Sequence, residues 1–303
     1  MSKWIVTGGT GLVGSRLVRE LTKADHDVVV FSRHPKSDSG RVRSVAWNPE
    51  EPGDWMKEVD GADVVVHLTG EPIAGGRWTD ERLAKIRSSR TESTALLADA
   101  MVSAEKKPRV FLSASAVGIY GMRKDDELLD ESTPPAADLI AGICVAWEKA
   151  ADPAEKAGIR VCHPRFGVVL SPDGGALKTM LPAFRAFVGG PLGDGKQWVS
   201  FVHLDDAVSA LLFAESHDKL SGPFNITAPN PVTMNELSAS IAHTLHRPNL
   251  MRVPAVAAHL ALGQMADIAL TGQRVMPKKL QDLGFEFRYP KIDDALEELL
   301  VSG

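Results

Sequence analysis

A glycine-rich segment at the start of the chain constrains its fold more than any other feature. The segment reads Thr7-Gly8-Gly9-Thr10-Gly11-Leu12-Val13-Gly14 and directly follows the apolar run Trp4-Ile5-Val6. Where a strand turns into a helix, Gly8 permits the tight turn, Gly11 lets the backbone approach an anion, and Gly14 lets the helix pack closely on the strand. The free N–H groups at the helix start face that anion. An amphipathic helix pattern and a second apolar run follow, so the segment predicts a dinucleotide-binding loop rather than an ordinary glycine turn.

Composition excludes several classes of protein. The 303 residues fit one large α/β domain with an elaborated C-terminal part, and the formal net charge of -5 gives no basic field for nucleic acid or an anionic membrane. The two cysteines, Cys144 and Cys162, have no metal-ligand spacing and are predicted to be buried free thiols. The first predicted strand begins at Lys3, which leaves no room for a signal peptide and predicts a cytoplasmic protein. The stretch Val253–Leu270 is interrupted by polar residues and predicts a buried amphipathic helix, not a membrane span.

Short apolar runs alternate with helical patterns through the first half of the chain. This alternation predicts an α/β fold with a doubly wound parallel sheet, Rossmann-like, and helices on both faces. The predicted strands are Lys3–Val6, Asp27–Phe31, Ser44–Trp47, Asp63–His67, Arg109–Ser113 and Arg160–His163. The predicted helices are Gly11–Ala24, Asp80–Ala104 and Asp138–Ala157.

The second half loses this regular alternation. The segment Ser171–Gly195 is rich in Gly and Pro and predicts irregular structure around a short helix. Further strands are predicted at Val199–His203 and Pro223–Ile226, with a helix between them that Asp205 caps. We therefore predict a dinucleotide-binding domain over residues 1–228, with 171–200 contributing to the substrate lobe. A smaller, mostly helical C-terminal lobe covers 229–303, with helices predicted at Asn235–Leu245, Ala255–Leu270 and Asp293–Val301.

The dipeptide Ser32-Arg33 closes the second predicted strand and bears on the choice of cofactor. A fold that selects NAD commonly has an acidic residue near this position to bind the ribose 2′-hydroxyl, whereas a basic or small polar pair accommodates the 2′-phosphate of NADP. Arg33 offers a charge-assisted fork and Ser32 a hydroxyl. The sequence therefore favours NADP(H) over NAD, the alternative being a solvated arginine in a polar loop.

Ligands of such sheets bind beyond the carboxyl ends of the strands. That rule places several polar segments along one edge, together with Arg90 on the helix after the fourth strand and Arg165 after the sixth. The residues predicted to bind the cofactor are Gly8, Thr10, Gly11, Leu12, Val13, Gly14, Ser32, Arg33, Leu68, Thr69, Gly70, Glu71, Arg90, Ser113 and Arg165.

Several motifs give the chain a resemblance to a known family. The segments TGGTGLVG, HLTGEP (67–72), SASAVGIYG (113–121), PRFGVVL (164–170) and FVHLDDAV (201–208) resemble the extended, epimerase-type short-chain dehydrogenase/reductases. The segments Trp147-Glu148, Gly189-Gly190-Pro191 and Gly272–Lys278 are similar to one subgroup, the "epimerase family" proteins often labelled nucleoside-diphosphate-sugar epimerases. The resemblance spans nearly the whole chain, and it implies a helix-mediated homodimer but no particular substrate.

The resemblance implies a catalytic Ser followed by a Tyr and a Lys one helical turn apart. The Tyr exchanges a proton with the substrate, the Lys lowers its pKa and holds the ribose, and the Ser orients the substrate oxygen. Ser115 matches the serine position. The Tyr and Lys positions hold Ile140 and Cys144, neither of which can take over that role.

Tyr120 is the remaining candidate proton donor. It precedes Lys124 by four residues, but the stretch is a Gly-flanked loop rather than a helix, and Tyr120 matches a loop tyrosine that often lines the family's substrate pocket. Ser115 and Tyr120 are therefore the predicted catalytic residues. His67 and His203 are expected to satisfy local backbone groups instead of acting as bases, and Arg274 is left open between pocket and surface.

The sequence is compatible with two functions. The first is an NADP-dependent oxidoreductase or sugar-nucleotide epimerase that acts on a small-molecule substrate with a modified active site and no metal. The second is a nonenzymatic NADP(H)-binding redox sensor or scaffold, which would explain a retained cofactor site without the usual acid–base pair. The fold alone does not choose between them.

Overall fold

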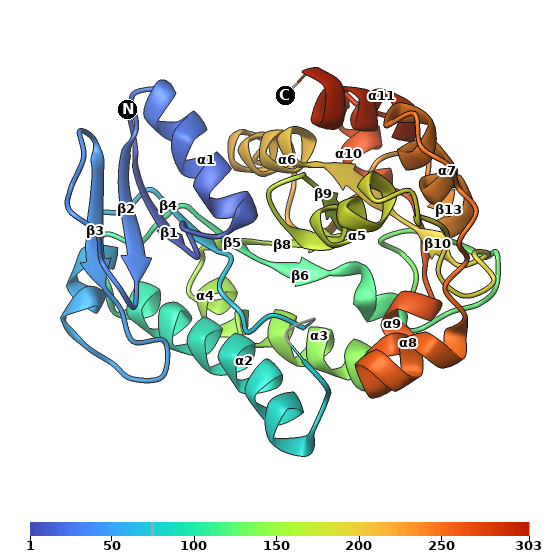
Figure 1. The fold of residues 1–303 in the computed structure, drawn as a ribbon. Helices are drawn as coiled ribbons and strands as arrows, with labels where there is room; N and C mark the ends of the chain where they lie inside the picture. Colours follow the sequence, from blue (N-terminus) through green and yellow to red (C-terminus); the bar gives the residue numbers. More distant parts are fainter. Residues whose placement is uncertain (74–75, 303) are drawn as a thin grey trace.

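The computed structural model describes residues 1–73 and 76–302, and its centre is an eight-stranded parallel sheet (Figure 1). Every strand pair in it is parallel, and the continuous Val/Ile-rich runs reflect burial on both faces. In spatial order the strands are β12 (Gly222–Ile226), β8 (Arg160–Phe166), β5 (Val110–Ser113), β4 (Val64–His67), β1 (Lys3–Thr7), β2 (Asp27–Ser32) and β3 (Val42–Ala46), with β6 (Ser115–Ala116) beside β8.

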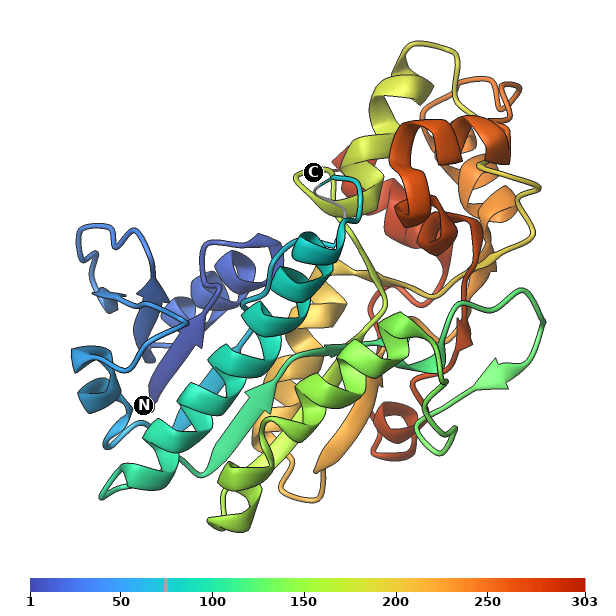
Figure 2. The same ribbon diagram turned by 90° about the horizontal axis from the view of Figure 1, so that it is seen from below.

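Helices cover both faces, as the doubly wound prediction requires. Successive residues of β1 point to opposite faces: Trp4 and Val6 pack with α1 (Leu12–Lys23) and α6 (Leu204–Ser216), while Ile5 packs with the opposite layer. That opposite layer contains α2 (Asp80–Ser103), α3 (Leu139–Lys149), α4 (Asp152–Lys156) and the 3₁₀ turn η1 (Asp54–Val59). Figure 2 shows α2 and α3 running side by side across it.

A second core lies beside the sheet, at the right of Figure 1. It combines α5 (Gly175–Arg185) with α7 (Met234–Thr244) and α11 (Ile292–Glu297), so residues before and after position 228 share one apolar cluster. Two short strand pairs contribute to it: β9 (Val168–Leu170) with β11 (Phe201–His203), and β10 (Trp198–Val199) with β13 (Val232–Thr233). A third pair, β7 (Leu128–Leu129) with β14 (Arg274–Val275), packs in a separate small cluster with Tyr120. Short helices complete the chain: η2 (Val117–Tyr120), α8 (Ala255–Leu262), η3 (Gly263–Met265), α9 (Ala266–Leu270), α10 (Lys278–Asp282) and the π-helical turn η4 (Glu298–Ser302).

Some predicted elements differ from those observed. The predicted helix 138–157 is divided into α3 and α4, because Pro153 is tolerated only in the first turn of a new helix. The predicted buried helix 255–270 is divided at Gly263, which has φ +61°, and the prediction of burial is wrong for α8, where Val256 and Leu260 are each 71% exposed. None of the described helices is both long and apolar enough to cross a membrane.

Candidate functional site

The glycine loop between β1 and α1 has the geometry that its spacing predicts. Gly8 adopts φ +67°, and its carbonyl accepts a hydrogen bond from Gly11 N at 2.9 Å. A Cβ on Gly14 would lie 2.2 Å from Gly8 O, so only glycine lets α1 approach the strand this closely. Helix α1 begins after Gly11 with no side-chain cap, which leaves its first N–H groups open. This cradle fits the pyrophosphate of a dinucleotide.

A buried hydrogen-bond chain fixes the neighbouring strand ends. Thr7 Oγ1 accepts from Leu68 N at 3.2 Å and lies 2.6 Å from His67 Nδ1, while His67 Nε2 lies 3.0 Å from Ser93 Oγ. The Ser93 hydroxyl donates to Ser89 O at 2.7 Å, so His67 Nε2 carries the proton and Nδ1 accepts from Thr7. Burial lowers the pKa of His67 to about 3, which keeps the ring neutral. The expectation that His67 serves backbone groups is wrong, because its partners are two side chains on β1 and α2.

The segment that follows β4 lies next to the hydrogen-bond chain of Thr7, His67 and Ser93. Leu68, Thr69, Gly70 and Glu71 are all half-buried, and Glu71 N donates to Ser89 Oγ at 3.0 Å. A Cβ on Gly70 would lie 3.1 Å from the guanidinium carbon of Arg90. The four residues therefore extend along the edge that carries the glycine loop.

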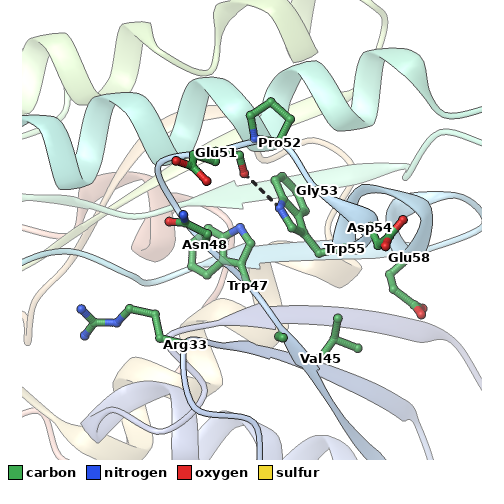
Figure 3. Close-up of a pocket in the computed structure, with 11 residues that line it drawn as sticks. Arg33, Val45, Trp47, Asn48, Glu51, Pro52, Gly53, Asp54, Trp55 and Glu58 are labelled. Carbon is green, nitrogen blue, oxygen red and sulfur yellow. Dashed lines mark hydrogen bonds between the residues drawn. The ribbon is translucent and has the colours of Figure 1, made fainter.

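The end of β2 faces a surface pocket of about 750 Å³ (Figure 3). Arg33 lies at one edge of this pocket and Glu58 at the opposite edge, with Trp47 and Trp55 between them. Arg33 is exposed and makes no ion pair with any described residue, whereas the Ser32 hydroxyl closes a local turn with His34 at 3.1 Å. The guanidinium predicted to select NADP thus remains open to a ligand.

The predicted catalytic residues belong to one buried polar network. Ser115 Oγ donates to Glu148 Oε1 at 2.7 Å, and Arg165 Nε and Nη2 donate to the two oxygens of the same carboxylate at 2.8 and 2.9 Å. Arg165 Nη1 also donates to the Tyr120 hydroxyl at 3.0 Å, which in turn donates to Asn225 Oδ1 at 2.8 Å. The network joins β6, α3, β8, η2 and β12 below the carboxyl edge of the sheet.

Ser115 and Tyr120 occupy different places relative to this edge. Ser115 lines a cavity of about 190 Å³ together with Ile140 and Cys144, the residues at the expected Tyr and Lys positions. Tyr120 is 1% exposed and does not line that cavity, and burial raises the pKa of its hydroxyl. Burial also raises the pKa of the Cys144 thiol to about 12, so it carries no charge near neutrality. The structure thus brings Ser115 to the cavity and turns Tyr120 away from it.

Other predicted cofactor contacts lie inside the fold. The Ser113 side chain is fully buried, and its hydroxyl has no partner among the described residues. Arg165 is 5% exposed because β8 continues to Phe166, past the predicted end of the strand, and all its side-chain nitrogens bond to Glu148 or Tyr120. Sequence reasoning missed Glu148, because its partner Arg165 lies 17 residues away on a different element.

Three other polar residues considered in the sequence, His203, Asp205 and Arg274, have structural partners. His203, not Asp205, caps α6, with Nδ1 accepting from Asp205 N at 3.0 Å; Asp205 pairs with Arg16 at 2.9 Å instead. Arg274 lies over the Trp198 ring, 4.5 Å from its centroid. Across residues 1–73 and 76–302, no cluster of His, Cys, Asp and Glu side chains is arranged to hold a metal ion.

Comparisons with known proteins agree with this geometry. A family model described as the NAD dependent epimerase/dehydratase family matches residues 4–227, and one described as a domain of unknown function (DUF1731) matches residues 253–299. An epimerase family protein of Staphylococcus aureus is 37% identical over 302 residues, 99% of both chains. The crystal structure of a human epimerase family protein (isoform 2) with NADPH is similar at a TM-score of 0.86 and 28% identity, covering 98% of both chains. A nucleoside-diphosphate sugar epimerase from Corynebacterium glutamicum matches at a TM-score of 0.79 and 35% identity, over 99% of this chain and 58% of that one.

Proposed function

Because the chain belongs to the NAD dependent epimerase/dehydratase family, we propose that it is an NADP(H)-dependent oxidoreductase or epimerase with a modified active site. The observation that carries this proposal is the pairing of an intact dinucleotide loop with Ser115 at a small cavity on the same edge of the sheet. The human relative whose structure contains NADPH supports the same cofactor.

The chain has residues suited to two parts of the cofactor, the pyrophosphate and the 2′-phosphate. The open N–H groups of Leu12 and Val13 at the start of α1 bind the pyrophosphate, and the segment 68–71 lies along the same edge. Arg33 binds the 2′-phosphate, since β2 ends without an acidic residue and the guanidinium has no competing carboxylate partner among the described residues. These contacts favour NADP(H) over NAD.

The acid–base chemistry rests on Ser115. The dinucleotide, when bound, would take a hydride from a substrate alcohol or return one to the corresponding carbonyl. In the oxidation, Ser115 Oγ at the cavity would accept the proton of the substrate hydroxyl while its own proton passes to the Glu148 carboxylate, to which it is hydrogen-bonded at 2.7 Å. Reduction of the carbonyl would use the same proton path in reverse. The residues at the usual Tyr and Lys positions, Ile140 and Cys144, transfer no proton and hold no cation.

Two measurements test this proposal. NADPH and NADH are titrated into the purified protein by nicotinamide fluorescence, and NADPH is expected to bind more tightly. NADPH oxidation is then followed over carbonyl compounds and nucleotide sugars, with Ser115→Ala expected to lose turnover and Tyr120→Phe expected to retain it. Equal binding of NADH would contradict the assignment of Arg33, and turnover that survives Ser115→Ala would contradict the role of Ser115.

A nonenzymatic redox sensor is the second candidate, and the buried Tyr120 favours it. With Tyr120 bonded inside the fold and Cys144 at the lysine position, the described part of the site offers no other tyrosine or lysine at the cavity. A sensor would bind NADPH and NADP⁺ with different affinities and show no turnover on any compound of the panel.

A further inference from the structure

The cavity between α2 and α3 has an unusual composition. Six of its lining residues are apolar, and the three polar ones are Arg90, Ser115 and Cys144. Ile268 of α9 packs against the isoleucine cluster that borders the cavity, without lining the cavity itself. A volume of about 190 Å³ has room for roughly six water-sized groups, which is small compared with most ligand pockets.

Arg90 is a buried cation with few partners. It is 8% exposed, its Nη1 donates to Ile86 O at 2.9 Å, and its guanidinium carbon lies 5.1 Å from the centroid of the Trp147 ring. No carboxylate of the described residues lies within ion-pair distance of it. Glu71, the acidic residue that faces it, instead pairs with Arg82 at 3.5 Å. A guanidinium has five N–H donors, and a buried charge without a counterion is costly. The described residues therefore supply Arg90 with no counterion, and its guanidinium has donors that can pair with the anionic group of a ligand.

The rest of the cavity excludes strongly polar ligands. The walls contributed by Ile86, Ile140 and Ile143 offer no hydrogen bonds, and each hydroxyl buried without a partner costs free energy. Cys144 remains an uncharged thiol, and the Ser115 hydroxyl donates its hydrogen bond to Glu148, so its oxygen can only accept a hydrogen bond from a bound ligand. A hexose ring, with a hydroxyl on most of its carbons, matches neither this size nor this surface.

We propose that the cavity binds a compact, mainly apolar carboxylic acid, whose carboxylate pairs with Arg90 and whose apolar body lies between α2 and α3. This inference rests on the proposed function and deepens it, because it names an apolar acid rather than a sugar as the substrate class. The sequence predicts Arg90 as a cofactor contact, and the shortage of counterions in the cavity now assigns it to the substrate.

Benzoate and its uncharged isostere benzamide test this assignment. Both are titrated into the full-length protein by calorimetry, with and without saturating NADP⁺. A charge-assisted hydrogen bond contributes about 1.5–3 kcal/mol, so the wild type is expected to prefer benzoate by roughly ten- to hundredfold. Arg90→Gln is expected to abolish that preference and Arg90→Lys to keep part of it. Arg87→Gln, an exposed position one turn earlier on α2, is the matched control and is expected to change nothing.

Three results would overturn the proposal. Benzoate binding no more tightly than benzamide would remove the need for a cation, and a preference that survives Arg90→Gln would locate the site elsewhere. Competition between NADP⁺ and benzoate would assign the cavity to the nicotinamide end of the cofactor. If Arg90→Gln fails to fold, Ile143→Phe decides the matter, because filling the cavity must weaken the binding of both probes. NADPH binding is measured on the same samples. If NADPH does not bind, the proposed function is contradicted, whereas the benzoate result still tests the assignment of Arg90.

Discussion

The two halves of the candidate site use their polar groups in opposite ways. At the glycine loop the donors are backbone N–H groups and the exposed Arg33, none of which is paired with a described side chain. At the other half, Ser115, Glu148, Arg165 and Tyr120 hydrogen-bond to one another below the surface. The first half is open to a charged ligand, whereas the donors of the second half hydrogen-bond to other side chains of the protein and stabilise the fold. The glycine spacing of the first half can therefore be recognised in the sequence, whereas the side-chain contacts of the second half cannot.

Breaking the buried network is expected to have the largest effect on stability. Glu148→Gln leaves Arg165 as a buried cation without a counterion, and removing one partner of such a pair costs about 3–5 kcal/mol. The free energy of unfolding, measured by urea denaturation, is expected to fall by that amount, while the NADPH affinity of the folded fraction stays unchanged. A loss of NADPH binding with stability preserved would contradict the division of the site into two halves.

A side chain at Gly14 in the glycine loop is expected to affect NADPH binding more than it affects stability. In Gly14→Ala the new Cβ meets Gly8 O at 2.2 Å, so α1 must move away from β1. Overpacking of this kind costs about 1–3 kcal/mol, and NADPH binding is expected to be lost in a fluorescence titration because the cradle is displaced.

Gly142→Ala provides the control for that variant. Gly142 is an exposed glycine within α3 with open space around it, and alanine at such a helical position stabilises by about 0.5–1 kcal/mol. If Gly14→Ala binds NADPH as Gly142→Ala does, close packing of α1 on β1 is not needed for the cofactor.

Acid is expected to weaken the link between the strand ends of the cofactor half. The folded-state pKa of His67 is about 3 against an ordinary value near 6.5, so the unfolded chain binds the proton first as the pH falls. Above about pH 6.5 the titration of His67 does not change the free energy of unfolding. Below that pH it lowers the free energy of unfolding by about 1.4 kcal/mol per pH unit, or about 2 kcal/mol between pH 7 and pH 5. Urea denaturation across this range measures the slope.

The variant His67→Gln separates this slope from other titrations. Gln retains one donor and one acceptor but does not titrate, so its stability is expected to vary less between pH 7 and pH 5 than that of the wild type. The pKa of His163 is also lowered by burial and adds to the slope in both proteins. Equal slopes in the two proteins would mean that His67 is already accessible to protons in the folded state.

Much of the fold was predictable because its signals are local. The apolar runs that became β1, β2, β4 and β5 are short, continuous and separated by helical patterns, and the glycine spacing is contained within eight residues. The catalytic half was not predictable in the same way, because Ser115, Glu148 and Arg165 meet only after three different elements pack together. The exposure of α8 could not be predicted from the sequence either, because apolar composition alone does not show whether another element covers a helix.

Removing the Tyr120 hydroxyl is expected to have the smallest effect on ligand binding and to give the sharpest distinction between the two halves. In Tyr120→Phe, Asn225 Oδ1 and Arg165 Nη1 each lose a partner, and each buried group left unsatisfied costs about 1–3 kcal/mol. Because Tyr120 is buried and does not line the cavity, this loss should appear in urea denaturation, with NADPH affinity and any NADPH-dependent turnover retained at the wild-type level. A variant that unfolds normally but loses turnover would show instead that Tyr120 reaches the substrate, and the catalytic half would then be an active site that opens on binding.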